Sequence, residues 1–117
     1  MREKFNALQH LVVDAASEKK AFDLLILDLR NRSNLTDCFM ICSANSKVQV
    51  QSIVDAIIEK CYLEKVKPLG VEGYSGGYWV VVDLGDLIAH IFHKEARLHY
   101  DLERLWGDVP VIQAVGE

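Results

Sequence analysis

Apolar residues recur three and four positions apart in two long stretches of the chain, which is the spacing of one face of an α-helix. These stretches predict helices over residues 3–19 and 47–65. Ser46 precedes the second helix and Gln49 follows three positions later, a pattern typical of a helix N-terminus. The chain turns at Pro68, because proline cannot continue a helix. Both helices are expected to pack an apolar face against the rest of the domain.

Shorter apolar runs predict β-strands, because branched and aliphatic residues bounded by turn-forming residues suit a buried strand. Glycine-containing turns at residues 75–77 and 84–86 separate the later strands, and the second of these turns joins its neighbours into an antiparallel pair. The predicted strands cover residues 22–29, 37–43, 69–74, 78–83 and 87–93.

A last helix is predicted near the C-terminal end, with Gly107 placed to end it. The order of elements is then α-β-β-α-β-β-β-α, which predicts an α/β fold of the α+β type, with helices packed on a mixed sheet. The length of 117 residues suits a single domain. We place this domain at residues 1–107 and a short C-terminal tail at 108–117. The apolar face of the last helix consists of Leu98, Leu102, Leu105 and Trp106.

The longest apolar runs, such as Leu24 to Leu27, fall far below the roughly 20 residues that span a bilayer. The charged N-terminal residues are not followed by the apolar core of a signal peptide. We therefore expect a cytoplasmic protein without a membrane partner.

Acidic residues are concentrated in the last third of the chain. Residues 1–82 carry ten basic and ten acidic side chains, whereas residues 83–117 carry three basic and seven acidic ones. The whole formal charge of −4 therefore lies in the second segment. Nucleic-acid binding requires clustered lysine and arginine, so direct recognition of RNA or DNA is disfavoured and a basic protein partner is favoured.

The three cysteines, Cys38, Cys42 and Cys61, are expected to be reduced thiols of the core, since a domain of this size does not need disulfides. Cys38 and Cys42 share a strand face, but they lack the nearby histidines of a zinc site. We prefer to interpret the three cysteines as small apolar residues of the core.

The polar clusters do not form a convincing catalytic site. His90 and His93 are three apart on a predicted strand and so point to opposite faces. Asp83 and Asp86 flank a turn, where an Asp carboxylate more often caps backbone amides than holds magnesium. Neither a phosphate-binding loop nor a serine nucleophile elbow is present. No enzymatic activity, metal or cofactor is predicted.

Trp79 is the residue most suited to a binding surface. On the strand 78–83 it shares a face with Val81 and Asp83, while Val80 and Val82 lie on the other face. The face with Asp83 is the poorer candidate for a dry core, so Trp79 is expected to be partly exposed on the open side of the sheet. Covering a tryptophan yields roughly 4 to 6 kcal/mol gross, although an ordinary core role remains open.

Four blocks of the sequence resemble the Iojap-like ribosomal silencing factors. The blocks run from Ser33 to Cys42, Pro68 to Gly73, Trp79 to Asp86, and Tyr100 to Trp106. The resemblance implies a nucleotidyltransferase-like fold that has lost its catalysis. It also implies binding to large-subunit ribosomal protein fourteen, which would block joining of the small and large subunits and repress translation. Family members also tend to be homodimers when free.

The docking surface is expected on the open sheet face and its acidic margin. Trp79 would be the anchor, with charged residues steering toward a basic partner. The candidate contact residues are Trp79, Val81, Asp83, Leu84, Asp86 and Glu103, with Asp37, His90 and Tyr100 in second rank.

Two alternative functions remain open. One is a large-subunit assembly factor. The other is a residual nucleotidyltransferase, which would need an Asp-x-Asp pair that this sequence lacks after its helix start.

Overall fold

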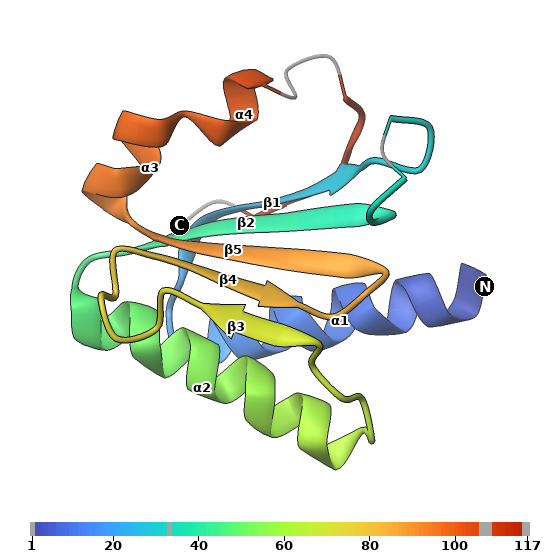
Figure 1. Ribbon diagram of the computed structural model, residues 1–117, viewed down its shortest axis with the longest axis horizontal. Coiled ribbons are helices and arrows are strands. Elements are labelled where there is room, and N and C mark those ends of the chain that lie inside the picture. Colours follow the sequence, from blue (N-terminus) through green and yellow to red (C-terminus); the bar gives the residue numbers. More distant parts are fainter. Residues whose placement is uncertain (1, 33, 106–108, 116–117) are drawn as a thin grey trace.

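The computed structural model describes residues 2–32, 34–105 and 109–115. Helices are separated by groups of consecutive strands along most of the chain (Figure 1). The helices are α1 (Arg2–Glu18), α2 (Lys47–Leu63), α3 (Lys94–Tyr100) and α4 (Leu102–Leu105). The strands are β1 (Phe22–Asp28), β2 (Cys38–Ala44), β3 (Gly70–Glu72), β4 (Trp79–Asp83), β5 (Leu87–His93) and β6 (Val111–Val115).

The described strands form one mixed sheet in the order β3-β4-β5-β2-β1-β6. Strands β2 and β5 run parallel, and the other neighbouring pairs are antiparallel. The long helices α1 and α2 cover one face of the sheet, and the short helices α3 and α4 lie on the other side (Figure 1). The prediction of a mixed sheet with helices packed on it is confirmed.

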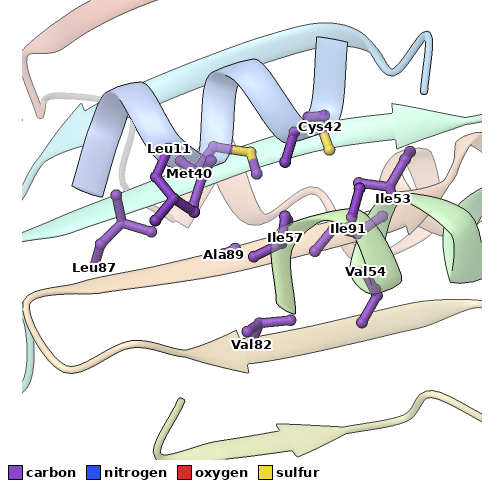
Figure 2. Close-up of a cluster of buried hydrophobic side chains, with 14 of the residues drawn as sticks. Leu11, Met40, Cys42, Ile53, Val54, Ile57, Val82, Leu87, Ala89 and Ile91 are labelled. Carbon is purple, nitrogen blue, oxygen red and sulfur yellow. The ribbon is translucent and has the colours of Figure 1, made fainter. Parts of the chain in front are cut away.

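The larger core lies between the sheet and helices α1 and α2, and we call it the helix-side core. Every second residue of the central strands points into it, as the period of a strand requires. Both helices contribute the apolar residues that recur at helical spacing. Figure 2 shows how they interdigitate: Leu11, Met40, Cys42, Ile53, Val54, Ile57, Val82, Leu87, Ala89 and Ile91.

Helix α2 is capped at its N-terminus by Ser46, which is the predicted cap. The Ser46 hydroxyl accepts the backbone N–H of Gln49 at 3.1 Å. The Gln49 side chain accepts the N–H of Asn45 at 2.7 Å, one residue before the cap, and donates to the carbonyls of Lys19 and Lys20 at 3.0 Å. The glutamine therefore also ties the end of α1 to the start of α2.

The last predicted helix is broken. Asp101 has a φ of +49°, which ends α3 and starts the new turn of α4. Leu98, expected on the packed face, is 83 % exposed because it lies on the solvent side of the short α3. Trp106 and Gly107 lie outside the described residues. The prediction of one continuous helix with Leu98 packed inward is therefore wrong.

The sequence pattern does not predict strand β6. It predicts a tail over residues 108–117, whereas Val111–Val115 pairs with β1 in an antiparallel arrangement at the edge of the sheet. The observed element order therefore has an additional strand after the last helix. Its partner β1 follows α1, so segments far apart in the sequence meet at this edge (Figure 1).

The three cysteines are buried and free, as predicted. Burial in the apolar core raises the pKa of Cys38 and Cys42 to about 12 and that of Cys61 to about 11. Because the reactive species is the thiolate, these thiols are chemically quiet. None of the helices among residues 2–32, 34–105 and 109–115 has the length and apolar character of a bilayer-spanning segment.

Replacing Gly73 with alanine is expected to destabilise the turn before β4. Gly73 has a φ of +84°, and a Cβ there would come within 2.3 Å of the Trp79 carbonyl oxygen, a backbone atom that cannot move freely. The left-handed conformation alone costs about 1 to 2 kcal/mol for a residue with a Cβ. Urea denaturation measures the loss, and Gly70→Ala is the control because nothing lies within 4 Å of a Cβ at that position. Equal losses in the two variants would contradict this account.

Candidate docking site

The alternation of side chains along β4 divides its residues between the two faces of the sheet. Val80 and Val82 are fully buried in the helix-side core. Trp79, Val81 and Asp83 point to the opposite face and are only partly buried. The predicted orientation of this strand, with Trp79 partly exposed, is confirmed.

Helices α3 and α4 cover only part of this opposite face. The apolar cluster beneath them is built on β1, β2 and the end of β5, and includes Leu27, Ile41, Phe92 and Ala96. Strand β4 and the first half of β5 lie outside this cover, except for Trp79 at the margin of the cluster. We call the open face this uncovered region together with the two aromatic residues at the margin of the cluster, Phe39 and Trp79. Its other residues are Val81, Asp83 and Ile88.

Trp79 belongs to a group of aromatic rings at one end of the open face. Its ring stacks on Phe92 with 5.0 Å between centroids, and Tyr100 of α3 packs against it at 4.7 Å. The His90 imidazole lies 6.0 Å away and meets Phe39 edge-on at 4.5 Å. Rings at these separations and angles attract one another beyond simple burial, so the indole is held by its neighbours.

His90 lies beneath this group and is only 6 % exposed. Its Nδ1 accepts the indole N–H of Trp79 at 3.1 Å, which places the imidazole proton on Nε2. Burial lowers the pKa of His90 to about 4, so the ring is neutral at physiological pH. The expectation that His90 is a direct contact residue is therefore corrected, because the side chain is covered by the rings around it.

An arginine holds α3 in place above the sheet. The guanidinium of Arg97 donates to the Ser43 hydroxyl at 2.9 Å and to the backbone carbonyl of Asp23. The N-terminus of α3 is capped by His93, whose Nδ1 accepts the N–H of Glu95 at 3.2 Å. These contacts fix the helix that carries Tyr100 against Trp79. His90 and His93 both lie on β5, three residues apart as predicted.

Three acidic residues lie near the end of β4 that is remote from Trp79. Asp83 lies four residues from Trp79 along β4, or about 13 Å. Its Oδ1 accepts the N–H of Gly85 at 2.9 Å, so the predicted turn cap is confirmed. The backbone N–H of Asp37 donates to the Asp86 carbonyl at 3.2 Å and brings these two residues to the same end. Among the described residues, no three potential ligands are grouped to hold a metal ion.

Two other predicted contact residues, Leu84 and Glu103, are not found on the open face among the described side chains. Leu84 is 7 % exposed and packs in the helix-side core, so it does not belong to the open face. Leu84 continues the alternation that buries Val80 and Val82 on the helix side, so the strand period already favoured this placement. The side chain of Glu103 lies outside the described residues. Tyr100, by contrast, is brought directly against Trp79.

Sequence reasoning missed Phe39, Phe92 and Arg97. Alternation does place Phe92 on the same strand face as His90, and this signal was available. Phe39 required the parallel register of β2 with β5, which pairs Phe39 with Ile88 and Ile41 with His90. That register depends on strands distant in the sequence, so no local pattern reports it.

Comparison with known proteins assigns the family. The family model described as "Ribosomal silencing factor during starvation" matches residues 2–117. Ribosomal silencing factor RsfS of Bacillus subtilis is 42% identical over 97 residues, covering 83% of this chain and 82% of its own. The protein of the same name from Halalkalibacterium halodurans is 38% identical over 109 residues, covering 93% of each chain.

A solved structure has the same fold. The crystal structure of a Chromobacterium violaceum protein superposes with a TM-score of 0.86 at 29% sequence identity, covering 88% of this chain and 86% of that one. The family resemblance of the four sequence blocks is thereby confirmed. This chain belongs to the ribosomal silencing factor family.

Proposed function

We propose that this protein docks through its open face onto the large ribosomal subunit, at ribosomal protein fourteen, and thereby keeps the small subunit from joining. The observation that carries the proposal is a partly exposed tryptophan on a sheet face that its own helices cover only in part. Tryptophan is enriched among residues that contribute most to binding, especially near the centre of an interface. Membership of the family supports a ribosomal partner.

Trp79 suits the role of anchor because its orientation is already set in the free protein. Phe92 and Tyr100 pack against the indole, and its N–H is bonded to His90. A side chain that is ordered before binding loses little rotamer freedom on docking. Val81 and Ile88 extend the apolar surface beside it, so the anchor is not isolated.

Three acidic residues near the far end of the open face favour a basic partner. Asp83, Asp86 and Asp37 lie together at the end of the sheet opposite Trp79. Charges at the edge of an interface speed association with a complementary surface and set its orientation, and they contribute less to final affinity. Association with the large subunit should therefore slow as salt concentration rises.

The proposed mechanism requires only that the protein occupies the joining surface of the large subunit, and it involves no chemical step. A folded domain seated on the joining surface excludes the small subunit from the same space. The protein is accordingly proposed to be a non-enzymatic, cytoplasmic repressor of translation that works without a cofactor and forms a homodimer when free. Purified large and small subunits can be mixed with the protein, and formation of whole ribosomes followed by density sedimentation. Undiminished joining at saturating protein would overturn the proposal.

Trp79→Ala is expected to weaken co-sedimentation with large subunits by about 30-fold or more, the loss typical of a central aromatic anchor. Tyr62→Ala is the matched control, because Tyr62 is 85 % exposed on α2, in the layer behind the sheet. The control should bind as the unchanged protein does. Equal binding by a folded Trp79→Ala variant would remove Trp79 from the site.

A further inference from the structure

We infer that His90 is a positioning residue, whose Nδ1 fixes the Trp79 indole in the orientation used for docking. This inference rests on the proposed function and adds a second residue to it. His90 is covered by its neighbours and so does not meet the partner itself. Its effect on docking passes through the hydrogen bond to Trp79, which joins two neighbouring strands of the sheet.

The hydrogen bond is the polar contact that orients the pair. Nε2 of His90 is buried and has no hydrogen-bond partner among the described residues. The bond from the indole N–H to Nδ1 is therefore the one polar contact that the structure gives the imidazole side chain. An imidazole so placed accepts at Nδ1 only while it is neutral, since both nitrogens of the charged ring are donors. Burial keeps the ring in the neutral form that accepts.

Ring packing alone would leave the indole orientation less defined. Phe92 and Tyr100 contact Trp79 through apolar surfaces, which are largely indifferent to the direction of the N–H. A hydrogen bond is directional and weakens steeply when bent. It turns the polar edge of the indole toward His90 and leaves carbon surface for the partner. We therefore expect the partner to place an apolar or cationic group on Trp79, and no hydrogen-bond acceptor for its N–H.

Two substitutions separate positioning from simple filling of space. His90→Phe keeps a planar ring beside Phe39 but removes the acceptor. His90→Gln offers an amide oxygen that can accept the indole N–H. We expect His90→Phe to weaken large-subunit binding about tenfold and His90→Gln to retain most of the affinity, since one hydrogen bond is at stake. Circular dichroism checks that both variants are folded.

A double substitution tests whether the effect passes through Trp79. Trp79→Phe has no N–H to donate, so adding His90→Phe to it should cause no further loss of affinity. The same tenfold loss on both backgrounds would overturn the inference and leave the docking proposal standing. Equal binding by His90→Phe and the unchanged protein would do the same. Failure of the unchanged protein to bind large subunits would overturn the docking proposal, and the positioning role with it.

A measurement on the free protein addresses the bond without the ribosome. The indole N–H signals in a proton–nitrogen correlation spectrum report hydrogen bonding and exchange with water. The Trp79 signal is the one lost in Trp79→Phe. It should exchange slowly in the unchanged protein and in His90→Gln, and shift and exchange faster in His90→Phe. An identical signal in all three proteins would overturn the inference, whatever the binding results.

Discussion

Replacing Ile57 with alanine is expected to lower the free energy of unfolding by about 2 to 5 kcal/mol, the range measured for such substitutions in well-packed cores. Ile57 is fully buried on α2, where it lies in the helix-side core near Ala89 of β5 (Figure 2). The loss combines the removed apolar contact with a cavity that rigid neighbours fill only partly. Chemical denaturation followed by circular dichroism measures it.

Leu63→Ala provides the matched control on the same helix. It removes the same number of carbon atoms from a side chain that is 72 % exposed, so its effect is expected to be within about 0.5 kcal/mol. Similar losses at the two positions would show that helix propensity, and not core packing, determines the effect.

Acidification is expected to destabilise the protein through His90. Burial lowers the pKa of His90 in the folded protein to about 4, whereas an unfolded chain has an ordinary value near 6.5. Between these values the unfolded state binds more protons, so stability is fully present above about pH 6.5 and is lost as the pH falls toward 4. The total loss from this group is about 3 kcal/mol.

The effect of His90 can be isolated by difference. Free energies of unfolding are measured from pH 7.5 to 4 for the unchanged protein and for His90→Phe, which lacks the titrating group. Carboxylates such as Asp28, whose pKa is lowered by its hydrogen bonds with Arg30, titrate in both proteins and cancel. As the pH falls, the free energy of unfolding of the unchanged protein should decrease relative to that of His90→Phe. Parallel curves would contradict a buried, neutral His90.

The central strands and long helices were predictable because their patterns are local and strong. Each residue of β5 from Leu87 to His93 was placed correctly, since the turn before it and the helix after it mark both ends. The orientation of Trp79 was predictable because it shares a strand face with Asp83, and a carboxylate disfavours packing of that face in a dry core. These inferences needed no knowledge of distant partners.

The failures involve positions where tertiary contacts decide. A left-handed residue at Asp101 breaks the last helix, although nothing in the sequence demands it there. The role of His90 depends on Trp79 from a neighbouring strand, so the sequence pattern does not show that this second-rank candidate contact residue is buried.

Strand β6 has a consequence for assembly of the fold during synthesis. It follows the other described elements in the chain, yet it pairs with β1, which is among the earliest. Until β6 arrives, the outer edge of β1 carries unpaired backbone N–H and C=O groups, and such edges recruit strands from other chains. The far margin of the sheet thus depends on a late, long-range pairing, and a chain shortened before Val111 would expose an aggregation-prone edge.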